Sequence, residues 1–489
     1  MSPMATAAER PTHLLHRLTS YSSDREWTEV PDDDRLVQDL VPNDESRRPQ
    51  PYKRYDDDLR RVLLPQDLPA TTVPATAVLA GTAQVASTPL DLAGLARLLY
   101  LSSGVTRRTR RPDGSLVLFR AAGSAGARFP LELYVAVPRG AGVVGLEPGL
   151  HWYDPEAHAL VVLGPPPSGD AVTLVVTGVP WRTGWRYRER GFRHIYWDAG
   201  TMLAQTLALA DSAGITARLF TAFPDAEVAA LVGADRVHEF PVALVALGEG
   251  GPAIHPAGDP MSGHHDPDGL EFPLVTAAQR AGEQTVLGAE VDRGATVGMS
   301  TEGGPSTDAV VASKGSVRRL HPDRSLPRQV LVDAMGAALR GIDVPHWVGV
   351  SGVDDVPTGI HRWPDLSSPV RALPEPAVRD ELFTASLEQG LARDASFVVM
   401  SGARLDDLDD HAYREVQLLA GLAEGRLHLM AYALGAAASG MTFRDSDLAH
   451  LLGQDVAGLL WTCVGVPEYR TRPSGQPGSP ADVTIVWPR

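Results

Sequence analysis

The chain has 489 residues, of which 44% are hydrophobic and 21% charged, as is usual for a globular protein. That length predicts two to four domains with large buried cores. The formal net charge of −16 argues against nucleic acid as a partner, because nucleic-acid binding needs a basic surface; a local basic pocket for one phosphate is still compatible with it.

The single cysteine, Cys463, excludes an internal disulfide and a cysteine-cluster metal site. No part of the sequence approaches 18 consecutive apolar residues, and the start lacks a basic segment followed by an apolar run. We therefore expect a cytoplasmic protein without a signal peptide or membrane span. Histidines gather over 255–268, but among glycine and proline and without helical spacing, so we expect a solvated loop and no metal.

Taken in chain order, the polar residues 1–70 predict an irregular arm with room for short helices. A first domain is predicted over 71–250, with a helix over 91–104 from its apolar spacing. The strongest helix signal runs from Tyr196 to Ala213 and is apolar on nearly every face, which predicts a central buried helix. Apolar runs predict strands over 131–137 and 159–164.

A linker is predicted over 251–308, where Gly, Pro, His and Asp are frequent, with one helix around 276–288. The second domain, 309–489, shows a helix-like segment over 326–339 and an apolar strand from Leu459 to Val466. Its tail, 473–489, reads as a loop with a strand-like end. The fold class is α+β, with a long buried helix beside a mainly antiparallel sheet in each domain.

The two domains repeat one another. Ala199-Gly200 falls on Ala420-Gly421 and Gly214 on Gly435, both at an offset of 221 residues. The string 148-PGLHWYDP-155 likewise resembles 357-PTGIHRWPD-365. A period of this length is about one domain, so the chain is interpreted as a fused homodimer. A binding site at the interface of such a pair can keep its residues in one copy and lose them in the other.

Two basic clusters occur in the second domain only. Lys314, Ser316 and Arg318 alternate in the first, and Arg470 and Arg472 share that spacing in the second. Such residues can converge on one phosphate, although either cluster alone is more often a solvated turn. The corresponding segments of the first domain, 79–90 and 247–254, contain no cation.

The first domain instead carries 120-RAAGSAGARFPLELYV-135, in which small residues precede a predicted strand. Such a loop lets backbone approach a flat ligand closely, although a tight turn before a strand has the same composition. Together with 147-EPGLHWYDP-155 and 187-YRERGFRHIYWDAG-200, this string resembles the nitroreductase-like flavoproteins. The resemblance is greatest to the branch with the azoline dehydrogenases of thiazole/oxazole-modified peptide biosynthesis, thiopeptides included, and it covers about 75–250 and 308–475.

The resemblance implies tandem nitroreductase-like domains that form a pseudodimer within one chain, able to oligomerise further, with one FMN at their interface. The loop 440–443 would lie at the N5 edge of the flavin and donate a backbone N–H. Near 336–350 the second domain lacks the Ser-Ala-Gly string, so one FMN per chain is expected. The implied cofactor residues are Lys314, Gly315, Ser316, Arg318, Arg470 and Arg472 at the phosphate, Gly123, Ser124, Ala125 and Gly126 over the flavin, and Met441 and Thr442 at the N5 edge.

One departure affects the expected chemistry. Azoline dehydrogenases carry a Lys-Tyr pair for proton abstraction, where this chain has Arg186-Tyr187. Arginine is a poor base, whereas Tyr187 could act as an acid or base if Arg186 lowered its pKa.

Three functions remain open. The first is FMN-dependent dehydrogenation of azolines to azoles in a ribosomally made peptide, with other enzymes of a peptide-modifying complex as further partners. The second is an FMN-dependent small-molecule oxidase or nitroreductase. The third is a non-catalytic partner subunit of such a complex.

Overall fold

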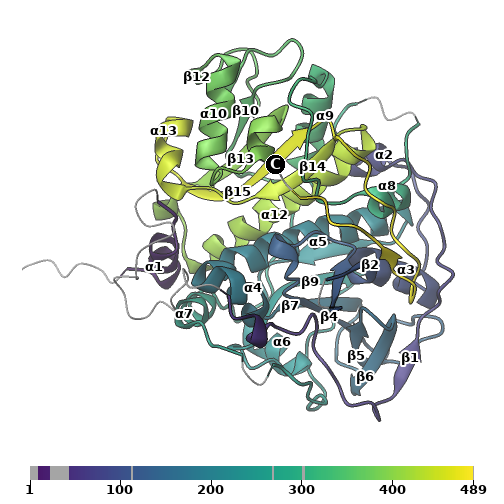
Figure 1. Ribbon diagram of the computed structural model, residues 1–489. Helices are drawn as coiled ribbons and strands as arrows, with labels where there is room; N and C mark the ends of the chain where they lie inside the picture. The colour runs from purple at the N-terminus through teal and green to yellow at the C-terminus, as the bar shows by residue number, and fades with distance from the viewer. Residues whose placement is uncertain (1–8, 23–42, 112–113, 267–268, 300–302, 488–489) are drawn as a thin grey trace, which may run out of the picture.

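The structure, a computed structural model, describes residues 9–22, 43–111, 114–266, 269–299 and 303–487. Two antiparallel sheets lie on either side of two long central helices, α5 (Gly191–Ser212) and α12 (Asp410–Ala433), as Figure 1 shows. The first sheet has the order β1-β6-β5-β4-β7-β9-β8 and the second the order β12-β11-β10-β13-β15-β14. Apart from the edge strand β1, the two orders are the same, which agrees with an internal duplication.

The strands of the first sheet are buried because both of its faces are covered. One face packs on α5, and the other packs on α6 and on Tyr52 and Tyr55 of the N-terminal segment. Alternate residues of each strand supply the two faces. The strands are β1 (Arg61–Leu63), β4 (Leu131–Val137), β5 (Gly149–Asp154), β6 (Ala159–Gly164), β7 (Val172–Gly178), β8 (Ala217–Phe220) and β9 (Phe240–Leu247).

The second sheet packs on α12 in the same way. The Asp409 carboxylate accepts the Ala412 N–H at 2.7 Å and caps the start of this helix. The strands are β10 (His346–Val350), β11 (Gly359–Arg362), β12 (Arg371–Ala372), β13 (Phe397–Ala403), β14 (Ala437–Met441) and β15 (Ala457–Gly465).

Shorter helices cover the sheets and the ends of the central pair. Those up to α9 are α1 (Pro11–Leu18), α2 (Ala75–Ala80), α3 (Leu92–Ser103), α4 (Pro180–Tyr187), α6 (Asp225–Val232), α7 (Pro273–Ala281), α8 (Thr307–Ser313) and α9 (Arg328–Ala338). They are followed by α10 (Glu375–Ala385), α11 (Gly390–Asp394) and α13 (Leu448–Leu452). Single 3-10 turns lie at Glu45–Arg47, Ala125–Ala127, Arg188–Arg190, Leu405–Asp407 and Asp445–Asp447.

The central helices cross where glycines let their backbones touch. A Cβ on Gly200 would lie 2.2 Å from the Leu418 carbonyl oxygen, and one on Gly421 would lie 2.3 Å from the Trp197 carbonyl oxygen. Real Cβ atoms are not found this close to backbone oxygen, so only glycine fits at either position. The repeated Ala-Gly pairs of the sequence are therefore the crossing point of α5 and α12.

A third, small sheet joins the C-terminal segment to the first half. It consists of β16 (Ala481–Asp482), which runs parallel to β2 (Val105–Arg110), and of β3 (Leu116–Arg120). In the second half no strand lies between α9 and β10, so the β2–β3 hairpin has no counterpart among the residues described there.

Most predicted elements are confirmed, namely the helices α3, α5, α7 and α9 and the strands β4, β6 and β15, with shifted ends. The strand-like end predicted for the tail is confirmed only in part, because Ala481–Asp482 pair as a strand but the described residues after them, 483–487, are not assigned to one. The predicted arm is more ordered than expected, since Arg61–Leu63 join the first sheet and the Lys53 ammonium lies buried 2.7 Å from Glu239. Residues 1–8 and 23–42 of that arm lie outside the described residues.

Candidate functional site

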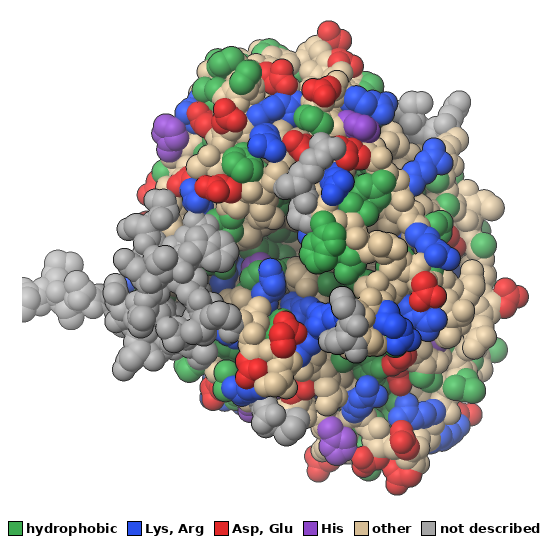
Figure 2. All heavy atoms as spheres, viewed as in Figure 1, with side chains coloured by type: hydrophobic (Ala, Val, Ile, Leu, Met, Phe, Trp, Pro, Cys, Tyr) green, Lys and Arg blue, Asp and Glu red, His purple; other side chains and the backbone are tan. Residues whose placement is uncertain are grey.

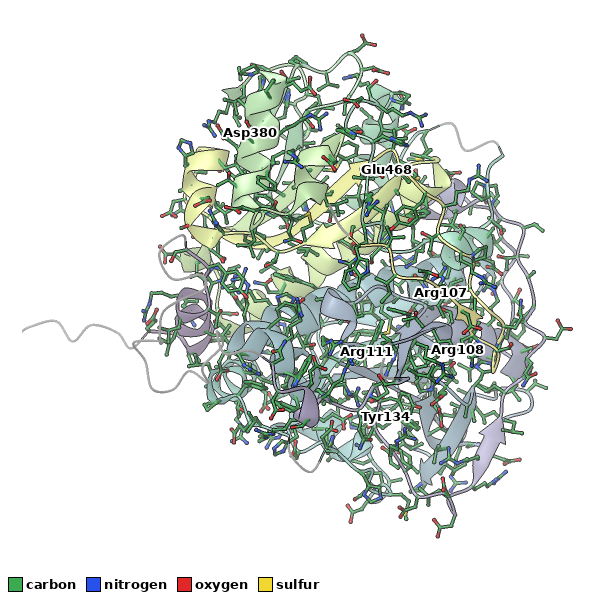
Figure 3. The ribbon with its side chains drawn as sticks, viewed as in Figure 1. Arg107, Arg108, Arg111, Tyr134, Asp380 and Glu468 are labelled. Atoms are coloured by element: carbon green, nitrogen blue, oxygen red, sulfur yellow. The ribbon has the colours of Figure 1, made fainter. Side chains whose placement is uncertain are left out.

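The two basic clusters of the second half meet at the first half. Arg107 of β2 donates hydrogen bonds to the carbonyl oxygens of Lys314 (2.9 Å) and Arg472 (2.8 Å). Figure 3 shows Arg107 between the two halves, beside the C-terminal segment. The structure therefore brings the two predicted clusters together, and the residue that joins them, Arg107, was not predicted from the sequence.

Lys314 follows the end of α8 and is only 4% exposed. Its ammonium donates to the Ala121 carbonyl oxygen at 3.3 Å. Burial lowers the pKa of Lys314 to about 8, while the nearby Glu424 carboxylate acts in the opposite direction. The next residue, Gly315, is fixed by the Tyr432 hydroxyl, which donates to its carbonyl oxygen at 2.7 Å.

The remaining cations of the clusters are exposed. Arg318, Arg470 and Arg472 form no ion pair with any residue that the structure describes. The Arg318 N–H donates to the Tyr469 hydroxyl at 2.9 Å, and the Arg472 guanidinium donates to the Asp482 carbonyl oxygen at 2.7 Å. Their positive charges are therefore available to an anion.

The Gly-Ser-Ala-Gly loop of the first half reaches this region. A Cβ on Gly123 would lie 3.8 Å from the Ser316 hydroxyl oxygen. This covering loop (residues 123–126) is therefore a neighbour of the phosphate cluster (Lys314, Ser316, Arg318, Arg470 and Arg472). At its other end Gly126 has a positive φ of 58°, and a Cβ there would lie 2.8 Å from the Tyr187 hydroxyl oxygen. The loop thus connects Ser316 of one half with the Arg186-Tyr187 pair of the other.

Tyr187 lies stacked on His194, with ring centroids 4.1 Å apart. Burial raises its pKa, and the opposite effect of Arg186, which is exposed, is smaller. The condition under which Tyr187 could act as a base, a pKa lowered by Arg186, is therefore not met, because burial outweighs the effect of Arg186. The phenol stays protonated at neutral pH, so it can donate a proton or a hydrogen bond but is a weak base.

Met441 and Thr442 differ from the expectation in their local structure. Gly440 and Met441 belong to β14, because this segment pairs with β15, and only Thr442 lies beyond the strand. The Met441 side chain is buried, with its sulfur 2.8 Å from Cys463 Sγ, so it points into the core. The Thr442 hydroxyl is buried and has no hydrogen-bond partner among the described residues.

A polar stripe along α5 and α12 was missed by the sequence analysis. Asp198 accepts hydrogen bonds from the Ser124 hydroxyl (2.5 Å) and from the Ala125 N–H (3.0 Å), which hold the covering loop in place. The Thr201 hydroxyl donates to Glu424 at 2.7 Å, and Glu424 lies 3.5 Å from His428. Asp198 falls within the string that carries the family resemblance, but its partner Ser124 could not be inferred from spacing alone.

The face drawn in Figure 2 is hollowed near its centre, between the two halves, and Lys and Arg side chains gather along one border of the hollow. A small cavity opens beside the covering loop and is lined by Ser103, Arg120, Gly123, Ser124, Asp198 and Met202, among others. Within the described part of the chain there is no cluster of three or more His, Cys, Asp or Glu residues that could hold a metal ion. The described helices include none that is both long and apolar enough to span a membrane.

No family model matches the chain. It is 29% identical over 177 residues to a protein of Methanocaldococcus jannaschii provisionally assigned as a nitroreductase, a match that covers 33% of this chain and 82% of the relative. A crystal structure from Anabaena variabilis, also provisionally assigned as a nitroreductase, has a TM-score of 0.67 and 20% identity, and the match covers 94% of this chain and all of that one. The chain therefore has a nitroreductase-like fold over most of its length.

Proposed function

We propose that the protein is an FMN-dependent oxidoreductase that binds one flavin per chain between its two halves. The observation that carries this proposal is the approach of Gly123 to Ser316, where an added Cβ would lie 3.8 Å from the hydroxyl oxygen. It brings the loop of the first half next to the basic cluster of the second half. The assignment of the relatives as nitroreductases supports the same class of chemistry by analogy.

The residues present fit FMN. A phosphate dianion needs cations and hydrogen-bond donors, and Lys314, Ser316, Arg318, Arg470 and Arg472 provide both. Among the described residues, the three arginines form no ion pair with a carboxylate, and only Lys314 has a buried carboxylate, Glu424, nearby. At Gly123 an added Cβ would meet only the Ser316 hydroxyl oxygen, at 3.8 Å, so the backbone there is open to the close approach of a flat ring. When bound, FMN supplies a two-electron acceptor that takes a hydride at N5.

We expect no second flavin on the other side of the pseudodimer. No Lys or Arg occurs in the segment 81–90 after α2, which corresponds to the segment after α8. A Cβ on Gly81 would overlap the Arg340 guanidinium, and Gly294 of the predicted linker packs directly on the backbone of Gly341. The proposal is therefore one FMN per chain.

The substrate class we propose is an azoline in a modified peptide, which would lose a hydride to the flavin and a proton to the protein. Tyr187 lies at the covering loop and can orient such a substrate through its hydroxyl. A small-molecule oxidase or nitroreductase remains the second candidate, favoured by the replacement of the Lys-Tyr pair by Arg186-Tyr187. A partner subunit without its own chemistry is the third, and it differs from both in having no need of flavin.

The phosphate assignment is tested with Arg318→Ala/Arg472→Ala. Each substitution removes charge-assisted hydrogen bonds of about 1.5–3 kcal/mol, so the affinity for FMN should fall about 100-fold or more. The double variant should purify folded but colourless, whereas the parent should be yellow with one FMN per chain. Arg393→Ala/Arg404→Ala, which changes two arginines of the second half outside the clusters, serves as the control and should keep its flavin. Two flavins per parent chain, or full flavin in the double variant, would contradict the proposal.

A further inference from the structure

We propose that Ser124 and Asp198 form a proton relay at the candidate flavin site, in which Ser124 faces the ligand and Asp198 holds the proton behind it. This inference rests on the proposed function, because a proton must leave the substrate whenever a hydride does. It assigns to the covering loop a chemical role in addition to its contact with the flavin.

The hydrogen bonds of Ser124 give the relay a direction. Its hydroxyl donates to Asp198 Oδ2 at 2.5 Å and accepts the Phe129 N–H at 2.8 Å. A hydroxyl oxygen can accept two hydrogen bonds, so one lone pair remains for a ligand. A proton that arrives at that lone pair lets the hydroxyl proton of Ser124 pass to the carboxylate of Asp198.

Asp198 is buried without a counterion. Its carboxylate is held by the Ser124 hydroxyl and the Ala125 N–H, and it forms no ion pair with a cation that the structure describes. A buried carboxylate without a cation is costly, and such groups are frequent at functional sites. Burial raises the pKa of Asp198 to about 7, although its two hydrogen bonds act in the opposite direction. The carboxyl is therefore suited both to take and to return a proton near neutral pH.

The other charged and titratable groups around Asp198 do not prevent it from accepting and returning a proton. Glu424 of α12 has the same sign and raises the pKa of Asp198 further, while Tyr187 stays protonated. Arg120 lines the same cavity, but its guanidinium donates to the carbonyl oxygens of Leu131 and Pro51 and to the Ser103 hydroxyl. Within the described residues, none of these groups forms an ion pair with the Asp198 carboxylate, so the carboxylate remains able to accept a proton.

Glu424 is a second buried carboxylate close to Asp198, and its partners stabilise its charged form. It accepts the Thr201 hydroxyl and lies 3.5 Å from His428, and these contacts together with Lys314 lower its pKa despite burial. Asp198 lacks such partners, and it borders the cavity that Gly123 and Ser124 also line. The difference in surroundings favours Asp198 for proton transfer.

The proposed cycle is balanced in atoms and electrons. The substrate gives one hydrogen with two electrons to the flavin and a second hydrogen, as a proton, through Ser124 to Asp198. Dioxygen then takes the two electrons and two protons, one from the flavin and one from Asp198, and leaves as hydrogen peroxide. The carboxylate is regenerated, and no other reactant is needed.

Dioxygen serves as the probe, so the test does not depend on the substrate. The holoenzyme is reduced by light and mixed with dioxygen over a range of pH. The rate of reoxidation in the parent should fall as the pH rises through about 7, because Asp198 then lacks the proton. Asp198→Asn should keep its FMN but reoxidise about 100-fold more slowly at low pH, without that pH dependence. Ser124→Ala, saturated with added FMN, should show the same slow and pH-independent reoxidation. In Asp198→Asn the amide can still accept the Ala125 N–H and donate to Ser124, so the loop stays in place.

Asp211→Asn is the matched control, because Asp211 lies on the same helix but is paired with Arg293. It should reoxidise like the parent. A readout independent of turnover is the infrared band of a protonated carboxylic acid, which should disappear in the parent on titration through about pH 7 and be missing in Asp198→Asn. Absence of that band in the parent, or a parent-like pH profile in Asp198→Asn, overturns the relay. A chain that takes up no FMN overturns the proposed function instead, while the infrared band of the flavin-free chain still reports on Asp198.

Discussion

Two ionisable side chains near the crossing of the central helices, Lys314 and Asp198, are buried and lose most of their hydration. The neighbouring groups that stabilise their charged forms are different. Lys314 has the carboxylate of Glu424 nearby, whereas Asp198 has only two neutral hydrogen-bond donors. Burial therefore shifts the pKa of both groups toward the neutral form, downward for Lys314 and upward for Asp198. Both shifts follow from the long-range contact of the two halves.

The shift of Asp198 predicts how stability depends on pH. Its pKa of about 7 in the folded protein lies above the ordinary value of 3.8, so the folded state holds this proton more tightly than the unfolded state. The contribution to stability is fully present below about pH 4 and is lost as the pH rises toward 7, by at most about 4 kcal/mol. Asp198→Asn does not titrate, so its free energy of unfolding relative to the parent should rise over that range. Urea unfolding at several pH values measures the difference, and parallel curves for the two proteins would count against a raised pKa.

The individual site residues were predictable to different degrees. Lys314, Ser316, Arg318, Arg470 and Arg472 were recognisable because cations and a hydroxyl recur at alternate positions, and the structure brings their segments together. Arg107 and Asp198 were missed because their roles depend on partners brought close only by folding. The sequence left open whether Arg186 lowers the pKa of Tyr187, and burial, which cannot be inferred from the neighbouring residue alone, raises it instead.

At the scale of elements, the contact of α5 with α12 determines how close the two halves come. Helices normally pack with their axes 8–10 Å apart, as set by the side chains at the contact, and glycine at the crossing allows the closest approach. The helix α5 was predictable because its apolar residues cover nearly every face, and a second long helix was expected from the repeat. The strand β14 was missed because Ala437–Met441 has no β-branched residue and forms a strand only through its pairing with β15.

Gly421→Ala tests the importance of this crossing. The added Cβ would meet the Trp197 carbonyl oxygen at 2.3 Å, so the helices must move apart, at a cost of about 1–3 kcal/mol. FMN should also bind more weakly, because the two sets of residues proposed to bind it lie on opposite halves. Gly336→Ala on α9 is the control: its Cβ would meet only the Val297 side chain, at 3.1 Å, and alanine favours helix by about 1 kcal/mol. Thermal unfolding and flavin titration of both variants make the comparison, and an unchanged Gly421→Ala would show that the crossing tolerates separation.

At the scale of the whole molecule, the two halves have similar sheets but differ in the segments around the interface between them. Among the described residues, only the first half has the β2–β3 hairpin and the covering loop, and the C-terminal segment of the second half pairs with that hairpin. The duplication was predictable from the repeated glycines, because backbone contact at a helix crossing conserves them in both copies. The attachment of the tail was not, since a strand of two residues leaves no periodic signal in the sequence.

Removal of residues 476–489 should weaken FMN binding, although none of the deleted residues belongs to the proposed FMN site. The truncation deletes β16, whose Ala481 and Asp482 pair with Arg107 and Arg108, and it takes the Asp482 carbonyl oxygen from Arg472. Net hydrogen bonds contribute about 0.5–1.5 kcal/mol each, so the loss of several should weaken FMN binding about 10- to 100-fold. The exposed edge of β2 should also promote association between chains. A shorter truncation of residues 484–489 keeps β16 and the Val483 N–H bond to the Arg108 carbonyl oxygen, so it should bind FMN like the parent. Equal flavin affinity in all three proteins would show that the tail covers β2 without holding Arg107 and Arg472 in position.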